Sequence, residues 1–347
     1  MKNLIKDLIA SEGPMPLDRY MALCLGHPKL GYYMSRDPFG AAGDFTTAPE
    51  INQIFGELIG IWCVAAWEAV GSPAPFLLAE LGPGRGTLMQ DMLRATSRHA
   101  EFSAAAQVHL VETSPALRKL QAEKLGPRQV SWHDSIESLP QEPMVFVANE
   151  FFDALPVRQL VQHGTNTYER RVNLMDGELE LVLVPAPPAG LTGDGLYEFS
   201  PISQAIAEGL GARLAALGGA GLLIDYGHLL SASGDTMQAL KDHKPVGILA
   251  YPGTSDLTAH VDFEALGHAF RRSGAAVLPP VTQGRFLGDM GLDARLNALS
   301  AKLSGDERTT FVAGARRLVD DKEMGQLFKV MAVAQAQRQP IYPFEGP

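Results

Sequence analysis

The chain has 347 residues, and its 46% hydrophobic and 20% charged residues are the balance of a globular protein with a large core. Lys and Arg number 29 against 39 Asp and Glu, so the formal net charge is −10 at pH 7. This balance argues against a nucleic-acid-binding surface, which needs clustered cations to neutralise phosphates. The sequence therefore predicts no nucleic-acid partner.

The two cysteines, Cys24 and Cys63, are too few for a disulfide scaffold or a thiolate zinc site. No apolar run approaches the roughly 20 residues that span a bilayer, so we expect no stable membrane insertion. Lys6, Asp7 and Glu12 interrupt the apolar opening of the chain, which therefore does not resemble a secretory signal. We expect a cytoplasmic protein in a reducing compartment.

Residues 1–72 are predicted to form an N-terminal helical extension. The apolar residues of 4–9 have the spacing of one helix face, and 18–26 is a second short helix. Segment 31–50 is dense in Gly, Pro and Asp and is predicted to be a loop. Segment 51–71 is apolar on most faces, which predicts a largely buried helix.

From residue 73 onward, short apolar segments alternate with helical ones, such as 87–99 and 114–126. This alternation predicts a parallel sheet with helices on both faces. The predicted strands are 76–82, 108–113, 130–134, 144–150, 221–227, 275–281 and 327–334. The fold class is therefore α/β.

Two insertions interrupt the alternation in the predicted domain 73–347. Segment 157–199 has period-2 character, and Asp176-Gly177 is a hairpin signal, so we expect antiparallel β structure there. Segment 228–262 is long and polar, and is predicted to be the second insertion.

A glycine-rich loop follows the first predicted strand of the sheet. Gly82, Gly84 and Gly86 form G-x-G-x-G, and Thr87 begins the following helix. Glycine allows a tight turn and close approach to a ligand, and a helix N-terminus offers free N–H groups. Glu80 before the loop suits an ammonium group and repels a pyrophosphate, which favours S-adenosylmethionine over NAD. The alternative is a turn without a ligand.

Acids also end the next two predicted strands. Glu112 lies where an acid of a nucleotide-binding sheet bonds ribose hydroxyls, although a strand-end glutamate is also often merely solvated. Asp134 ends the third strand, where the adenine edge is expected. Asp134 is equally suited to cap the short segment that follows it.

Six motifs in order carry a resemblance to a known family. They are GDFTTAPEINQIFGE (43–57), ELGPGRGTL (80–88), VETSP (111–115), NEFFDALPV (149–157), LLIDYGH (222–228) and DLTAHVDF (256–263). The chain resembles the MidA/DUF185 family of S-adenosylmethionine-dependent methyltransferases over nearly its whole length. The mitochondrial members are regarded as complex I assembly factors and protein arginine methyltransferases.

The resemblance implies a Rossmann-like, seven-stranded class I methyltransferase sheet with an N-terminal helical extension and β or loop insertions. It implies S-adenosyl-L-methionine as cofactor, held at Gly82, Gly84, Gly86 and Glu112. It also implies a protein substrate, with a complex I core subunit as a candidate. Because no mitochondrial presequence is visible, we expect a bacterial member.

The motif NEFFDALP follows the fourth strand and offers groups that arginine methylation needs. A guanidinium stays protonated at neutral pH, so a pocket must grip it with carboxylates and accept a proton. Asn149 is a candidate ligand of the cofactor or of a substrate N–H, and Glu150 and Asp153 are candidate catalytic carboxylates. Phe151 and Phe152 are either pocket walls or core, and Asp153 could instead cap a turn.

Asp225 ends the fifth strand at the same sheet edge and is a further catalytic candidate. His260 is a candidate proton acceptor, because histidine titrates near neutral pH, although a lone histidine in a loop more often has a structural role as a hydrogen-bonding group. Asp256 and Asp262 could orient it, and Asp262 could instead cap the next helix. The acids lack a metal-ligand spacing such as H-x-x-x-H, so we expect no metal site.

The loop 43–50 is predicted to fold over the cofactor as a lid, with Thr46 and Thr47 at the cofactor. An alternative or additional role is helix capping, because Thr47 and Glu50 fit a capping box with Pro49 in the first turn.

The function predicted first is protein arginine N-methylation. A cofactor-binding assembly chaperone with little catalysis and a small-molecule methyltransferase are the alternatives. A NAD-dependent oxidoreductase ranks last, because of the glycine spacing and Glu80.

Overall fold

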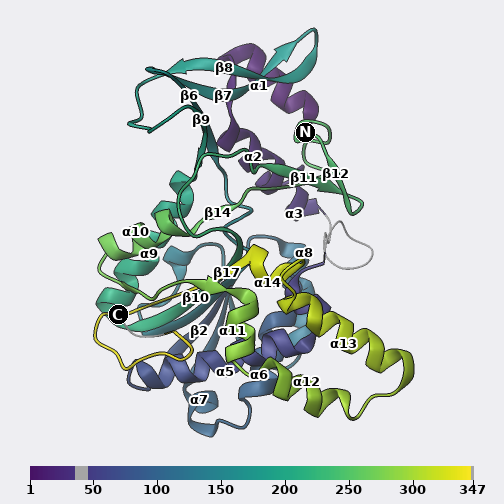
Figure 1. Cartoon of the computed structure of the whole chain (residues 1–347), viewed down its shortest axis with the longest axis vertical. Coiled ribbons are helices and arrows are strands. Elements are labelled where there is room, and N and C mark those ends of the chain that lie inside the picture. The colour runs from purple at the N-terminus through teal and green to yellow at the C-terminus, as the bar shows by residue number, and fades with distance from the viewer. Residues whose placement is uncertain (36–45, 345–347) are drawn as a thin grey trace.

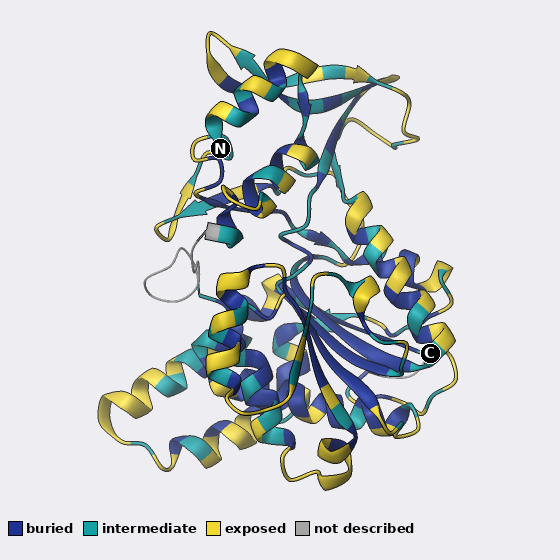
Figure 2. Cartoon of the chain, turned by 180° about the vertical axis from the view of Figure 1, so that it is seen from behind, coloured by how far each residue is buried: buried dark blue, intermediate teal, exposed yellow. Residues whose placement is uncertain are grey.

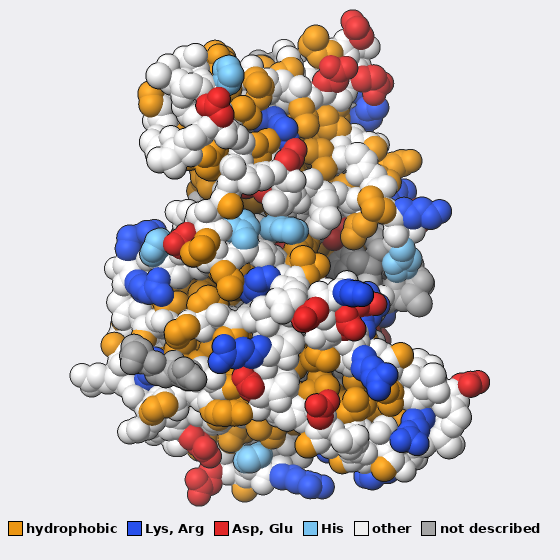
Figure 3. Space-filling view, in the orientation of Figure 1, with side chains coloured by type: hydrophobic (Ala, Val, Ile, Leu, Met, Phe, Trp, Pro, Cys, Tyr) orange, Lys and Arg blue, Asp and Glu red, His pale blue; other side chains and the backbone are white. Residues whose placement is uncertain are grey.

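The computed structural model describes residues 1–35 and 46–344. The chain forms two lobes joined at a narrower waist (Figures 1 and 3). Gly43, Asp44 and Phe45 of the predicted lid lie outside the described residues. Within the described part of the chain, no helix has the length and apolar character needed to cross a membrane.

The larger lobe is built on a mostly parallel sheet with the strand order β15-β17-β10-β5-β2-β3-β4. Only β17 runs against its neighbours. This confirms the predicted Rossmann-like α/β fold. Its strands are β2 (Phe76–Leu81), β3 (Ala106–Val111), β4 (Val130–His133), β5 (Met144–Asn149), β10 (Gly219–His228), β15 (Ala276–Val277) and β17 (Phe328–Ala334).

Two short strands raise the number of strands in this sheet from the predicted seven to nine. β14 (Val261–Asp262) pairs with β10, and β16 (Val281–Thr282) pairs with β17. The predicted strand 275–281 is therefore wrong in detail, because it is divided between β15 and β16. Pro279 and Pro280 stand at the break, and proline has no N–H to donate to a strand ladder.

The central strands are buried on both faces, as Figure 2 shows for most of their length. Leu78 and Val145 pack on one face, while Leu77 and Phe146 pack on the other. This two-residue alternation is the strand period, and both sets are apolar because helices cover both faces.

The first face is covered by helices from both ends of the chain, and α9 and α10 pack on the second. Those on the first face are α4 (Ala48–Ile51), α5 (Gln53–Ala69), α6 (Thr87–Thr96), α7 (Ala100–Ala105), α8 (Pro115–Leu125), α11 (Gln283–Asp289), α12 (Leu292–Ser300), α13 (Gly305–Val319) and α14 (Met324–Leu327). Those on the second are α9 (Pro201–Leu217) and α10 (Phe263–Arg272), and a 3₁₀ turn, η1 (Ile136–Ser138), precedes β5.

The smaller lobe, called the cap lobe below, comprises residues 1–35, 158–199 and 238–258. It shares one core, in which Ile5 and Tyr20 pack with Val172 and Leu257. Its elements are α1 (Lys2–Glu12), β1 (Met15–Pro16), α2 (Leu17–Gly26), α3 (Tyr32–Ser35), β6 (Arg158–His163), β7 (Asn166–Met175), β8 (Glu178–Ala186), β9 (Gly195–Phe199), β11 (Gln238–Lys241), β12 (Lys244–Val246) and β13 (Asp256–Thr258).

Segment 157–199 forms antiparallel strands β6 to β9, with Asp176 and Gly177 at the β7–β8 turn, as predicted. β1 pairs with β7, so the opening residues and this insertion are joined by a strand ladder as well as by the shared core.

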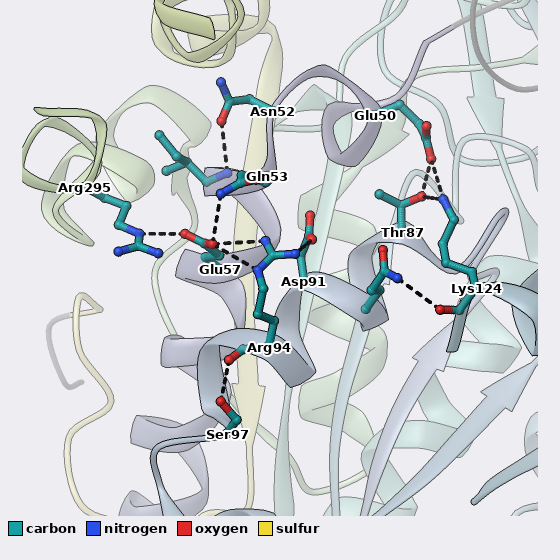
Figure 4. A network of polar contacts seen from close by, with 12 residues as sticks. Glu50, Asn52, Gln53, Glu57, Thr87, Asp91, Arg94, Ser97, Lys124 and Arg295 are labelled. Carbon is teal, nitrogen blue, oxygen red and sulfur yellow. Dashed lines mark hydrogen bonds and ion pairs between the residues drawn. The ribbon is translucent and has the colours of Figure 1, made fainter. Parts of the chain in front are cut away.

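A buried carboxylate holds α5 against α6 and α12 (Figure 4). Glu57 is 4% exposed and accepts hydrogen bonds from Arg94 Nη2 at 3.0 Å and Arg295 Nε at 2.6 Å. The pKa of Glu57 is lowered overall. Burial acts to raise it, but the hydrogen bonds from Arg295 and Arg94 together outweigh the effect of burial. This network connects α5, which packs on the first face of the sheet, to α6, which follows the glycine loop.

The close contact of α5 and α6 depends on glycine. A Cβ at Gly60 would lie 2.8 Å from Met92 Cα, whereas a Cβ at the exposed Gly209 of α9 meets nothing within 4 Å. Gly60→Ala should lower the free energy of unfolding by about 1–3 kcal/mol through overpacking. Gly209→Ala should raise it by roughly 0.4–1 kcal/mol, because alanine favours the helix. Urea unfolding of both variants checks this pair, and equal shifts would contradict it.

Candidate active site

A cavity of about 910 Å³ lies at the carboxyl ends of β2, β3, β5 and β10, where the two lobes meet. Residues of both lobes line it, including Tyr33 and Asp256 of the cap lobe. The predicted site residues that line it are Thr46, Thr47, Glu80, Gly82, Gly84, Thr87, Glu112, Asp134, Asn149, Glu150, Asp153 and His260. Gly86 and Asp225 lie behind this lining.

The glycine loop turns tightly between β2 and α6. Gly82, Gly84 and Gly86 have φ values of 64°, 51° and 78°, a backbone region that favours glycine. Gly86 N–H donates to Pro83 O at 2.7 Å, and α6 starts at Thr87. A Cβ at Gly82 would lie 3.0 Å from the Phe151 ring. A side chain is therefore disfavoured at this position, and the backbone of the loop itself forms this part of the cavity wall.

Glu80 is buried below this loop, at the end of β2. Burial raises its pKa to about 8, the Met89 amide that hydrogen-bonds it lowers the pKa, and the charge of Glu112 raises it. One carboxylate oxygen, Oε2, is buried without a hydrogen-bond partner in the described structure. Such an atom is costly unless a ligand donates to it.

Glu112 follows β3 and is held in place by two donors. Its Oε1 accepts from Ser114 N at 2.7 Å and its Oε2 from Gln121 Nε2 at 3.3 Å. Burial raises its pKa despite these bonds. Arg118 connects Glu112 O to Asp134 Oδ1, with the latter bond at 2.7 Å, and the Asp134 carboxylate remains largely exposed.

The turn after β5 places Asn149 and Glu150 in the cavity. Glu150 has φ 49°, and its N–H donates to Ile224 O at 2.9 Å. Its Oε1 accepts from Asn149 Nδ2 at 3.1 Å and from Ala48 N at 3.2 Å. Burial, and then the charge of Asp153, raises the Glu150 pKa to about 8. Asn149 Oδ1 is buried without a partner.

Asp153 lies one turn further on and is 6% exposed. Burial raises its pKa to about 6, and the hydroxyl of Tyr226 partly offsets this rise. Its Oδ1 is also buried without a hydrogen-bond partner. Asp153 therefore faces the cavity with an unsatisfied acceptor.

Asp225 supports this turn from behind the cavity lining. Its Oδ2 accepts from Phe152 N at 3.0 Å and Asp153 N at 3.1 Å, and it is 1% exposed. Asp225 does not line the cavity. We therefore interpret this predicted catalytic candidate as a residue that positions the turn.

The two adjacent phenylalanines divide between wall and core. Phe151 lines the cavity, whereas Phe152 is 4% exposed and packs in the core between the sheet and α9–α10. Their rings meet edge to face at 5.2 Å. The positive φ of Glu150 sets this division, because it turns the chain before the pair.

His260 lines the cavity beside Tyr226, with ring centroids 5.5 Å apart. Burial, and then the charge of His228, lowers its pKa. Its backbone N–H donates to Thr236 Oγ1 at 2.9 Å. Asp262 caps α10 by accepting from Ala265 N at 2.9 Å, so the capping alternative is the one observed for it.

Thr46 and Thr47 lie at the mouth of the cavity, just before α4. Thr47 precedes α4 without a side-chain cap, so the predicted capping box is wrong. Glu50 instead points toward the helix that follows the glycine loop. Its carboxylate accepts from Thr87 Oγ1 and lies 3.7 Å from Lys124 Nζ (Figure 4). This network holds α4 against the start of α6.

Some residues that line the cavity were not predicted from the sequence, because they come from elements outside the predicted motifs. Tyr33 comes from α3, and Met324 and Phe328 come from the C-terminal end. Tyr226 follows Asp225 directly, so its position at a strand end was a usable signal. Residues 1–35 and 46–344 contain no group of three or more His, Cys, Asp or Glu side chains able to hold a metal ion.

The geometry defines a class of protein. A glycine loop after the first strand of a Rossmann-like sheet faces a cavity, an acid follows the second strand, and buried acceptors point inward. Glu80 and Asn149 offer acceptor atoms to an ammonium group rather than donors to a pyrophosphate. These features define a class I methyltransferase.

Comparisons with known proteins agree with this class. Residues 58–281 match the family model described as "Putative S-adenosyl-L-methionine-dependent methyltransferase". The chain is 37% identical to the mitochondrial protein arginine methyltransferase NDUFAF7 homolog of Drosophila melanogaster, over 94% of this chain and 82% of the relative. It is also 37% identical to mitochondrial protein arginine methyltransferase NDUFAF7 of Homo sapiens, over 95% of this chain and 82% of the relative.

A solved structure from Burkholderia thailandensis, bound to S-adenosyl-homocysteine, has a TM-score of 0.86 and 29% identity to this chain. The match covers 98% of this chain and 93% of that one. This chain belongs to the family of S-adenosyl-L-methionine-dependent methyltransferases, which confirms the resemblance seen in its motifs.

The residues present fit S-adenosyl-L-methionine. Glu80 Oε2 and Asn149 Oδ1 are buried acceptors at the cavity that lack donors within the described chain, and the amino group of the cofactor can donate to them. Glu112 is placed to accept from ribose hydroxyls, and Gly84 lines the cavity at the glycine loop. When bound, the cofactor supplies a methyl group on a sulfonium.

A side chain at Gly84 should weaken cofactor binding. Gly84 has φ 51° and lines the cavity, so Gly84→Ala should lower S-adenosyl-homocysteine affinity by at least about tenfold, or roughly 1.4 kcal/mol. Gly177→Ala is the control, because its φ of 81° carries a similar strain at a remote hairpin with no neighbour within 4 Å. Calorimetry on both variants checks this, and equal affinities would contradict it.

Proposed function

We propose that the protein methylates arginine side chains of a protein substrate. The observation that carries this proposal is the pair Glu150 and Asp153, which line the cavity beside the cofactor residues. Neither carboxylate forms an ion pair with a Lys or Arg side chain of residues 1–35 and 46–344. Asp153 is buried and Glu150 is half-buried. Carboxylates withdrawn from water without a cation are costly, so a cationic substrate group stabilises them. The names of the curated relatives support the same reaction.

The chain's own residues would act on the substrate in three ways. Glu150 and Asp153 accept N–H bonds from the guanidinium and hold it in one orientation, which is the larger part of catalysis in a displacement reaction. The Phe151 ring forms part of the cavity wall and can face the flat cation. Asp153 or Glu150 takes the proton that the substrate nitrogen loses, and the raised pKa of each makes it a better base.

The partner and the compartment are part of the proposal. We infer a complex I core subunit as a candidate protein substrate, on the strength of the motif resemblance. A cytoplasmic location is supported by Cys24 and Cys63, which are buried and unpaired as in a reducing compartment. The named relatives are mitochondrial proteins.

Labelling tests the reaction class. The protein is incubated with a cell lysate and a methyl donor that carries a labelled methyl group, and labelled products are analysed by mass spectrometry. We expect label on guanidino nitrogens of a protein. Label on small molecules alone, on lysine, or on nothing would contradict the proposal, and the last result would favour an assembly chaperone.

Glu150→Gln should separate substrate chemistry from cofactor binding. The amide cannot carry the negative charge that holds the guanidinium, so turnover should fall by at least roughly a hundredfold, while S-adenosyl-homocysteine affinity stays within about twofold. Glu137→Gln is the matched control, because Glu137 lines the same cavity but is exposed. Unchanged turnover in Glu150→Gln would remove Glu150 from the reaction.

Substrate affinity should rise with pH. Because the pKa values of Glu150 and Asp153 are raised to about 8 and about 6, the free cavity holds protons that a bound guanidinium displaces. Binding of an arginine peptide should therefore release protons and strengthen from about pH 6 to about pH 8, then level off. Calorimetry in buffers of different ionisation enthalpy counts the protons, and affinity that falls with pH would contradict this sign.

A further inference from the structure

Part of the wall of the cavity that Glu150 and Asp153 line comes from the cap lobe. Tyr33 of α3 and Asp256 of β13 both line the cavity. The Tyr33 hydroxyl donates to Asp256 Oδ1 at 2.9 Å, and Asp256 is 4% exposed. The two residues are 223 positions apart in the chain, so only the shared fold of the cap lobe brings them together.

These cap-lobe residues are held close to the turn of Asp153. Ala259 N–H, one residue after β13, donates to Asp153 O at 3.0 Å. The charge of Asp256 is among the causes that raise the pKa of Glu150. Burial, and then the charges of Asp256 and Asp153, raises the pKa of Tyr33. Asp256 is therefore within electrostatic reach of Glu150, and its neighbour Ala259 is hydrogen-bonded to the Asp153 backbone.

One further observation points to a ligand beside these residues. Asp153 Oδ1 is buried at the cavity and has no hydrogen-bond partner in the described structure. An acidic cluster alone repels itself, but this unpaired acceptor requires a donor from outside the chain or from water. A cation with several N–H donors can donate to it and reduce the repulsion between the carboxylates.

We propose that Asp256 is a substrate-binding residue, which reaches across from the cap lobe to bind the same guanidinium as Glu150 and Asp153, with Tyr33 as its positioning residue. A guanidinium has five N–H donors in a plane and can bond carboxylates on opposite sides, whereas an ammonium has three donors around one point. The two lobes together thus select arginine over lysine. This inference rests on the proposed function and names the residues that make it specific for arginine.

The test uses the full chain with S-adenosyl-homocysteine bound and N-acetyl-arginine amide as the probe. Asp256→Asn should weaken probe binding by roughly tenfold to a hundredfold, and Tyr33→Phe by about three- to tenfold. In turnover assays with an arginine peptide, Asp256→Asn should raise KM more than it lowers kcat. Affinity for S-adenosyl-homocysteine should stay unchanged in both variants.

Two matched controls are available, one within the cap lobe and one that pairs with it from a neighbouring segment. Tyr20→Phe removes a hydroxyl that donates to Ile248 O at 2.8 Å away from the cavity, and Asp235→Asn removes a carboxylate paired with Arg170 at 2.7 Å. Both controls should bind the probe like the wild type. Asp256→Glu, which keeps the charge, should recover part of the affinity lost in Asp256→Asn.

The outcomes separate this inference from the proposed function. If the wild type binds the probe and Asp256→Asn binds it equally well, the role of Asp256 is wrong while arginine methylation stands. If the wild type binds N-acetyl-lysine amide as tightly as the arginine probe, the specificity claim is wrong. If the wild type binds no arginine probe, the proposed function fails as well. A loss of probe affinity as large in the two controls would also overturn the inference.

Discussion

The burial of carboxylates without cationic partners is the constraint on which the site depends. Glu80 and Asp153 are buried and Glu150 is half-buried at the carboxyl edge of a parallel sheet, where helices and the cap lobe limit access to water. Burial raises the pKa of each one, and no described Lys or Arg side chain pairs with Glu150 or Asp153. Removing charge from water is unfavourable unless partners replace the solvent. The cavity is therefore organised to receive positive charge.

Backbone N–H groups supply much of the hydrogen bonding that holds this arrangement. Asp225 accepts two backbone N–H bonds from the turn at Phe152 and Asp153, and Glu150 accepts from the first N–H of α4. Elements far apart in the chain thus converge on one short turn. The same turn bonds Ala259 next to the cap lobe, so the position of that lobe and the geometry of the carboxylates are set together.

Much of the fold could be predicted from the sequence, because strand periodicity and burial leave a direct mark on composition. The apolar runs gave the strands of the sheet, and the acids at their ends indicated the correct edge. The division of segment 275–281 was missed, although Pro279 and Pro280 carried the signal. The glycines of the loop were recognisable because only glycine readily adopts the positive φ values found there.

Other parts of the site were not readable from local pattern. Whether Phe151 or Phe152 enters the cavity depends on the φ of Glu150, which the residue type does not predict. Thr47 and Glu50 fit a capping box in sequence, but Glu50 finds Thr87 and Lys124 on other helices. Tyr33 and Asp256 meet only because two separate segments share the core of the cap lobe.

The most direct test of this account is the protonation state of Glu150 itself. Infrared difference spectroscopy at pH 7, with Glu150→Gln to assign the band, reports the carboxyl C=O stretch. The account predicts a protonated carboxyl in the free protein, and its loss when S-adenosyl-homocysteine and an arginine peptide bind. A Glu150 that is already ionised in the free protein, or that stays protonated in the complex, would contradict it.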